Sequence, residues 1–159
     1  MTSTTRITVE PIPPERAGEV SAIAFPLFRE VYKDTESEVV EAFLQKTQTP
    51  ESIAEQIRSG TVYLFIRYDG EIAGYLAYEF DDEGLRLSKL YLLPAFRGKG
   101  IGKYLLGYVE EIAREKGSRM IHLEVNEVNP HAMEFYRRHG FVPAERIDYR
   151  RMVMRKRLS

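Results

Sequence analysis

The stretch PAFRGKGIGKYLL, residues 94–106, alternates glycines with positively charged residues immediately before an apolar, helix-like run. Its glycines are Gly98, Gly100 and Gly102, and its cations are Arg97, Lys99 and Lys103. After it, apolar residues recur on one face of a predicted helix, at Ile101, Tyr104, Leu105, Tyr108 and Ile112. The preceding run LRLSKLYLL, residues 85–93, is typical of a strand, and Pro94 ends it. The stretch is therefore predicted to join a strand to a helix.

This loop has the composition of an anion site. The first turn of a helix leaves backbone N–H groups unpaired and carries a partial positive charge, so it attracts anions. Glycines let the backbone approach the ligand, and neighbouring cations add full charge, which favours phosphate or pyrophosphate. The spacing G-x-G-x-G is not the G-x-G-x-x-G of dinucleotide-binding folds. A Walker loop is also excluded, because it would need glycine at Arg97 and Ser or Thr at Tyr104.

Composition limits what such a loop could belong to. The chain has 159 residues, 43% hydrophobic and 30% charged, which predicts one compact domain over residues 1–159. Lys and Arg total 23 against 24 Asp and Glu, so the overall charge does not favour nucleic acid or an anionic membrane as partner. There is no cysteine, which excludes a thiolate metal site and a cysteine nucleophile. Without a signal-like or membrane-spanning apolar run, we expect a soluble, cytoplasmic protein.

The first half of the chain predicts one strand, helices and a hairpin. Residues 6–10 alternate like a strand, residues 15–24 read as a helix, and Pro26 is expected to interrupt it. Thr49 as N-cap and Pro50 in the first turn predict another helix, which Gly60 ends. Two strand-like runs then flank Asp69-Gly70, a dipeptide typical of a tight hairpin.

The second half adds strands and helices around the glycine loop. Residues 81–84 make a reversal into the strand before the loop, and the helix after the loop ends at Lys116-Gly117. Residues 120–125 predict a strand, and Asn129 caps a helix that ends at Gly140. Residues 141–147 and 151–158 predict two final, paired strands. The fold class is α+β, with about seven strands and helices on the faces of the sheet.

Two motifs in this order resemble the GNAT superfamily of acetyl-CoA-dependent N-acetyltransferases. RGKGIG, residues 97–102, is similar to its R-x-x-G-x-G/A signature, and NPHAMEFYRRHGF, residues 129–141, looks like its N-x-x-A-x-x-F-Y-x-x-x-G-F segment. The L-E-V of residues 123–125 also resembles the corresponding strand of ribosomal-protein N-terminal acetyltransferases. Within the superfamily, the chain most resembles these enzymes and the polyamine-type acetyltransferases. The resemblance implies a mixed, mostly antiparallel sheet with helices on both faces, and acetyl-CoA as co-substrate without a metal.

The resemblance also implies roles for individual residues. The backbone of the glycine loop would hold the coenzyme A pyrophosphate; the residues concerned are Arg97, Gly98, Lys99, Gly100, Ile101, Gly102 and Lys103. The backbone of Leu90, Tyr91 and Leu92 would pair with the pantetheine arm, with the Leu90 amide facing the thioester carbonyl as an oxyanion hole. Asn129 and Tyr136 would meet the coenzyme near its pantetheine and sulfur, although helix capping also explains Asn129.

The chemistry of acetyl transfer suggests which side chains move protons. The leaving group is a thiolate, and a phenol with a pKa of about 10 is a proton donor at neutral pH, so Tyr136 is the predicted general acid. The attacking amine must lose a proton, and Glu124 on the strand of residues 120–125 is the candidate base. The alternatives left open are water, Glu79, or a purely solvated role for Glu124.

The acceptor is not encoded in a motif. It is a primary amine such as a small amine, a polyamine or a peptide amino group, and an acidic run at Asp34, Glu36, Glu38 and Glu41 would favour a cationic acceptor if it lined the cleft. His122, His131 and His139 lack metal-site spacing. A catalytically idle module that binds coenzyme A is the alternative function, and whether the protein forms a homodimer stays open.

Overall fold

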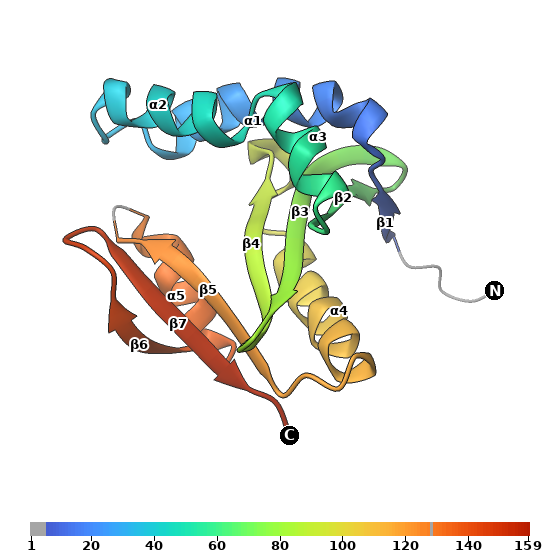
Figure 1. Ribbon diagram of the computed structural model, residues 1–159, viewed down its shortest axis with the longest axis vertical. Helices are drawn as coiled ribbons and strands as arrows, with labels where there is room; N and C mark the ends of the chain where they lie inside the picture. The colour runs from blue at the N-terminus through green and yellow to red at the C-terminus, as the bar shows by residue number, and fades with distance from the viewer. Residues whose placement is uncertain (1–5, 128) are drawn as a thin grey trace.

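The computed structural model describes residues 6–127 and 129–159 of the chain, whose strands form a single seven-stranded sheet (Figure 1). The strands are β1 Ile7–Pro11, β2 Val62–Tyr68, β3 Glu71–Asp81, β4 Gly84–Leu92, β5 Met120–Asn126, β6 Val142–Arg146 and β7 Arg151–Arg157. They lie in the order β1-β2-β3-β4-β5-β7-β6. Neighbouring strands are antiparallel except for β4 and β5, which are parallel. The predicted mixed, mostly antiparallel sheet is confirmed.

The tight turns follow from local residue chemistry. Asp69 has φ 52° and Gly70 has φ 86°, the left-handed geometry that a two-residue hairpin requires and that Asp and Gly tolerate. At the β3–β4 turn, the Asp81 side chain accepts hydrogen bonds from the backbone N–H groups of Glu83 and Gly84. These two turns connect β2, β3 and β4 into a meander that leads into the glycine loop.

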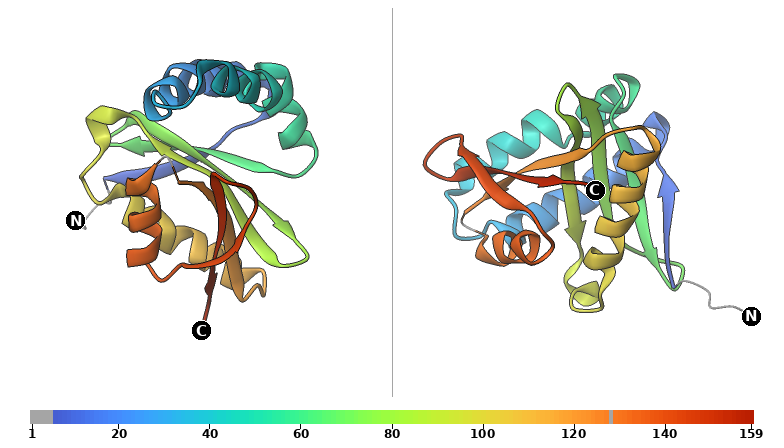
Figure 2. Two further views of the ribbon diagram at one scale, coloured as in Figure 1. Left: turned by 90° about the vertical axis from the view of Figure 1, so that its left-hand side faces the viewer. Right: turned by 90° about the horizontal axis from the view of Figure 1, so that it is seen from below.

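Helices cover both faces of the sheet, as the two turned views show (Figure 2). The helices are α1 Ala17–Val31, α2 Ser37–Thr47, α3 Pro50–Arg58, α4 Ile101–Glu115 and α5 Pro130–Arg138, with short 3-10 turns η1 Pro14–Arg16 and η2 Pro94–Phe96. The first three helices pack on one face together with the buried ring of Tyr75. Helices α4 and α5 pack on the other face, around Leu105 and Phe141. The sheet therefore separates two apolar cores.

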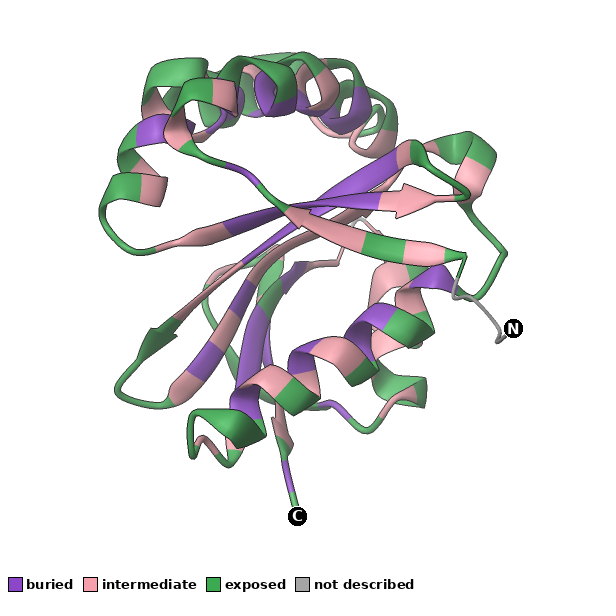
Figure 3. Ribbon diagram, turned by 90° about the vertical axis from the view of Figure 1, so that its right-hand side faces the viewer, coloured by how far each residue is buried: buried purple, intermediate pink, exposed green. Residues whose placement is uncertain are grey.

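One predicted boundary in this region is wrong. Pro26 does not end the first helix; α1 continues through it to Val31. Ala24 before the proline and Leu27 and Phe28 after it are all buried, and their i, i+3, i+4 spacing places them on one side of the helix. Figure 3 colours the ribbon by burial and shows buried segments among exposed ones in the helices of this face. Their packing against the sheet outweighs the backbone hydrogen bond that a proline removes.

Candidate active site

A cleft opens where β4 and β5 separate. The register that the structure describes pairs Leu85 with Ile121 and Arg86 with His122, after which the two strands diverge (Figure 1). The space between them is part of a cavity of about 890 Å³, which we call the β4–β5 cleft. Its walls come from β4 residues 87–92, β5 residues 123–126, the glycine loop and α5. A ligand arm lying here has strand backbone on both sides.

The glycine loop forms one end of this cleft. Gly98 has φ 77° and Gly100 has φ 79°, backbone geometry that disfavours most side chains. A Cβ atom at either position would meet nothing within 4 Å, so the surface above the loop is open. Gly100 is the N-cap of α4 and supplies no side chain to its first N–H groups. The loop therefore presents helix-start amides to the cleft, which is the arrangement that binds anions.

The third glycine has a different role from the first two. A Cβ atom at Gly102 would lie 2.9 Å from the ring of Phe135 on α5, closer than such atoms approach. Gly102 thus allows α4 and α5 to pack closely, which fixes the position of the α5 residues that line the cleft. Gly102 also lines the cleft together with Gly98 and Gly100, so its predicted contact with the ligand stays a prediction beside this packing role.

The three cations of the loop point in different directions. Lys103 and Arg97 line the cleft, and the Arg97 guanidinium donates to the Leu92 carbonyl at 3.1 Å and to Glu30 at 2.8 Å. Lys99 does not line it; its Nζ lies 5.8 Å from the centre of the Tyr68 ring. The positive charge near the loop amides therefore comes mainly from Lys103 and Arg97.

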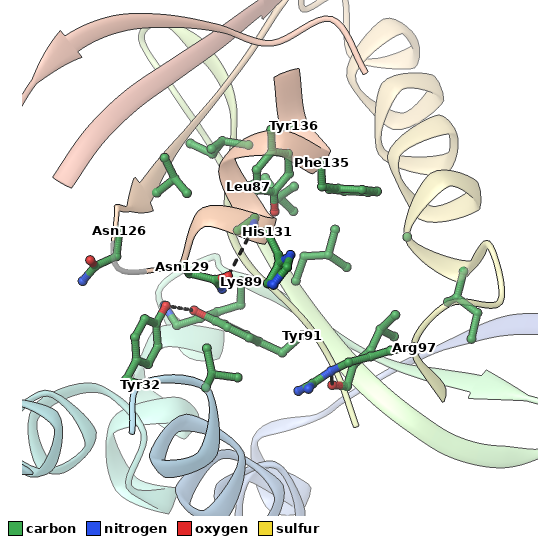
Figure 4. A pocket seen from close by; sticks show the side chains of 18 of the residues that line it. Tyr32, Leu87, Lys89, Tyr91, Arg97, Asn126, Asn129, His131, Phe135 and Tyr136 are labelled. Carbon is green, nitrogen blue, oxygen red and sulfur yellow. Dashed lines mark hydrogen bonds between the residues drawn. The ribbon is translucent and has the colours of Figure 1, made fainter. Parts of the chain in front are cut away.

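Helix α5 supplies two of the predicted residues. The Asn129 side chain accepts a hydrogen bond from the Ala132 N–H at 3.2 Å, so it caps the helix as expected, and it also lines the cleft. The Tyr136 hydroxyl points into the cavity (Figure 4). Burial, and to a lesser extent Tyr32, raises the pKa of Tyr136 above its usual value. The phenol is consequently protonated at neutral pH and available as a donor.

The strand β4 is irregular beside the cleft. Ala77 of β3 lies opposite Lys89 while Tyr78 lies opposite Leu87, so Ser88 is an extra, bulged residue. Beyond the bulge, Leu90 packs toward the α4 core. Tyr91 packs toward the helices of the opposite face, where its hydroxyl lies 3.1 Å from the hydroxyl of Tyr32 (Figure 4). Leu90, Tyr91 and Leu92 all line the cleft, and the pairing of their backbone with the pantetheine arm stays a prediction.

The candidate base is engaged in ion pairs. Glu124 lines the cleft and is exposed, but its carboxylate lies 3.3 Å from the Arg151 guanidinium and 3.8 Å from that of Arg86. A proton acceptor in this position would have to loosen one of these contacts. Glu79, the alternative, lies on β3, accepts from the Thr61 hydroxyl at 2.9 Å and does not line the cleft.

The histidines make ordinary structural contacts where the structure records them. His122 is buried on β5, 2.9 Å from Asp81, and the His139 ring lies 2.8 Å from the Phe135 carbonyl. His131 lines the cleft. Over residues 6–127 and 129–159, no three acidic or histidine side chains are grouped to hold a metal ion. Within the same ranges, no helix is both long and apolar enough to cross a bilayer.

A second cavity, of about 400 Å³, adjoins the first on the side of α1 and α2, and we call it the α1–α2 pocket. Seven residues line both cavities, namely Tyr32, Ser88, Lys89, Tyr91, Glu124, Val125 and Asn126. Sequence reasoning missed Tyr32 and Lys89. The acidic run does not line the cleft as a group, which was the condition for favouring a cationic acceptor. Glu41 pairs with Arg29, Glu36 pairs with Arg150, and of the four acids only Asp34 lines the cleft.

Comparison with known proteins agrees with this architecture. An uncharacterized N-acetyltransferase from the pepI 3' region of Lactobacillus delbrueckii subsp. lactis is 33% identical over 132 residues, 77% of this chain and 76% of the relative. An uncharacterized N-acetyltransferase of Mycobacterium tuberculosis is 34% identical over 131 residues, covering 79% of this chain and 82% of the relative.

A solved structure shares the fold over almost the whole chain. PaiA N-acetyltransferase from Thermoplasma acidophilum, in complex with coenzyme A, superposes with a TM-score of 0.83 over 96% of this chain and 99% of that one, at 23% identity. The family model described as "Acetyltransferase (GNAT) family" matches residues 23–141, which include the glycine loop, the β4–β5 cleft and α5. The chain therefore belongs to the GNAT family and is an acetyl-CoA-dependent acetyltransferase.

Proposed function

We propose that this protein transfers the acetyl group of acetyl-CoA to the primary amine of a small acceptor, by direct attack in a ternary complex. The observation that carries the proposal is the junction of two cavities at β4. The β4–β5 cleft has an anion-binding loop at one end, and the α1–α2 pocket adjoins it along the same strand, with Ser88, Lys89 and Tyr91 lining both. Two substrates can thus approach one point from two adjoining cavities.

In this mechanism, acetyl-CoA lies in the β4–β5 cleft with its pyrophosphate on the amides that follow Gly98 and Gly100. Its pantetheine arm runs along the backbone of residues 90–92 between the separated strands. The thioester carbonyl accepts a hydrogen bond from the Leu90 N–H, which stabilises the negative charge that develops on the oxygen when the amine attacks. PaiA N-acetyltransferase, a protein of the same fold, was solved in complex with coenzyme A.

The reaction then needs two proton transfers. The acceptor nitrogen attacks the carbonyl carbon, a C–N bond forms, and the C–S bond of the tetrahedral intermediate breaks. Tyr136, whose hydroxyl points into the cavity, gives its proton to the departing thiolate. Glu124 lines both cavities and takes the amine proton, directly or through water, once the acceptor loosens its contact with Arg86 or Arg151.

Steady-state kinetics with both substrates varied tests the proposal. Small amines, polyamines, aminoglycosides, amino acids and peptide amino termini would be screened for release of free coenzyme A thiol. With an accepted amine, reciprocal plots that intersect are expected for a ternary complex. Parallel plots would instead indicate an acetylated enzyme intermediate, and coenzyme binding without turnover on any amine would reject the proposed transfer.

A further inference from the structure

The α1–α2 pocket has a wall that is unusually rich in apolar and aromatic groups. These are Phe28, Tyr32, Val39, Val40, Phe43 and Tyr91. The Phe28 ring lies 5.5 Å from that of Phe43 and 4.6 Å from that of Tyr91, so the wall is a packed aromatic surface. The volume of the pocket, about 400 Å³, is in the range of pockets that enclose small molecules. The wall therefore suits an acceptor with an apolar body.

Four cations also line this pocket, and three of them have carboxylate partners. Arg86 lies 3.5 Å from Glu79 and 3.8 Å from Glu124. Arg151 lies 3.3 Å from Glu124 and 3.0 Å from Asp148. Arg150 lies 3.2 Å from Glu36. The fourth cation is Lys89.

Lys89 differs from the arginines in having no carboxylate contact. Among residues 6–127 and 129–159, its Nζ makes no ion pair or hydrogen bond; its recorded contact is with the Phe43 ring, 5.7 Å from the ring centre. Burial, followed by the charge of Arg86, lowers the pKa of Lys89 to about 8, while Glu79 and Glu124 oppose this shift. The side chain is nevertheless mostly protonated at pH 7, because this pKa is above neutrality.

A protonated and desolvated lysine without a counter-ion is stabilised most by a ligand that supplies a negative charge. Lys89 lines both cavities, as does Glu124, so an anion bound to Lys89 would lie beside the place where the acceptor nitrogen must attack. Thr35 also lines the pocket, and its buried hydroxyl oxygen has no hydrogen-bond partner among residues 6–127 and 129–159. A polyamine would instead bring additional positive charge to Lys89 and Arg86.

We propose that the acceptor is an α-amino acid with a large apolar side chain, whose carboxylate binds the Nζ of Lys89 and whose side chain packs on the aromatic wall of the α1–α2 pocket. The inference rests on the proposed function and names its substrate class. Lys89 acts as a specificity-determining residue. The acceptor amine then points toward Glu124 and the thioester, while its carboxylate compensates the half-buried charge of Lys89.

Matched acceptors with and without the carboxylate test this inference. L-phenylalanine and phenethylamine have the same amine and ring, as do L-leucine and isoamylamine, and spermidine represents the polyamines. The wild-type kcat/KM is expected to be about 10- to 100-fold higher for each amino acid than for its decarboxylated partner, the range that hydrogen bonds to charged groups supply. A preference for phenethylamine or spermidine would overturn the inference.

Variants at Lys89 test whether this residue recognises the carboxylate of the acceptor. Lys89→Met is expected to lower kcat/KM for phenylalanine about 10- to 100-fold, mainly through KM, and to leave that for phenethylamine nearly unchanged. Lys89→Arg retains the charge and should keep part of the preference. Lys46→Met, at an exposed lysine of α2 outside both cavities, is the control and should match wild type. Equal losses of kcat/KM on both acceptors would overturn the inference, because they would indicate that Lys89 acts in proton transfer or in packing and does not recognise the carboxylate.

A binding measurement separates this inference from the proposed function. Calorimetric titration of phenylalanine and leucine into protein saturated with coenzyme A should detect binding to wild type and its loss in Lys89→Met. If neither amino acid binds or reacts but another amine is acetylated, the acceptor inference fails and the proposed function stands. If no amine in the whole screen is acetylated, the proposed function fails, whatever the titration with the two amino acids shows.

Discussion

Removing the charge of Lys89 should stabilise the ligand-free protein at neutral pH. The pKa of this lysine falls from its ordinary 10.5 to about 8 on folding, because burial disfavours the charged form. Between these two values the unfolded chain binds a proton that the folded protein does not, so stability rises with pH there. Below pH 8 the full cost of burying the charge applies, up to about 3 kcal/mol. Lys89→Met removes that cost.

Urea unfolding at pH 7 and at pH 9.5 would measure this effect. The gain of Lys89→Met over wild type is expected to be largest at pH 7 and to shrink by pH 9.5, where the wild-type lysine is already neutral in the folded state. Loss of the contact with the Phe43 ring reduces the gain by about 0.5 kcal/mol or more. Lys46→Met serves as the control. A stability difference that is zero, or identical at both pH values, would refute the reasoning.

Four further predictions follow from the site and the sheet. Gly100→Asp should weaken acetyl-CoA binding at least 100-fold in calorimetry through repulsion and backbone strain, whereas Gly107→Asp, exposed on α4, should bind normally. Tyr136→Phe should lower turnover about 10² to 10⁴-fold with little change in coenzyme affinity, since only the proton donor is lost. The activity of Glu124→Gln should depend more steeply on pH than that of wild type and should recover as the pH rises toward the pKa of the amine. Equal pH–rate profiles of variant and wild type would reject Glu124 as the base. Gly74→Ala should destabilise by about 3 kcal/mol in urea unfolding, because its Cβ would lie 2.0 Å from the Tyr91 carbonyl oxygen.

The local turns and caps could be predicted from sequence because their causes are local. Asp69-Gly70 forms the hairpin, Thr49 accepts a hydrogen bond from the Ser52 N–H at 3.1 Å, and Asn129 caps α5. Each of these depends on a few adjacent residues whose side chains or φ angles satisfy the backbone directly. The order of strands around the glycine loop followed from the same signals.

The first helices could not be predicted as well, because packing decides them. Helix α1 passes through Pro26, and the acidic run after it extends into α2, which begins at Ser37. In α2 only Val40 and Leu44 are buried, a weak apolar pattern that the surrounding charges obscure. Both helices depend on the sheet face they cover, which lies far away in the sequence.

The sequence also did not predict which face of the sheet carries Lys89, because a bulge in β4 changes the alternation of its side chains. Strict alternation along β4 would place Lys89 with Leu85 and Leu87, toward the α4 core. The bulge at Ser88 shifts the alternation by one residue, so that Leu90 takes the α4 side and Lys89 joins the other face. No residue type in LRLSKLYLL signals a bulge, so the sequence did not indicate an acceptor pocket with a lysine in it.

The bulge also explains why the two cavities meet at one place. Over the residues that the structure describes, β4 pairs with β5 only up to Arg86, and the extra residue follows two positions later. A bulge bends and twists its strand more strongly, which turns the rest of β4 away from β5 and leaves its backbone facing the cleft. The same rotation carries Lys89 to the α1–α2 side, while the adjoining Leu90 amide is left beside the cleft. One irregularity in one strand thus positions both the group proposed to polarise the thioester and the group proposed to select the amine.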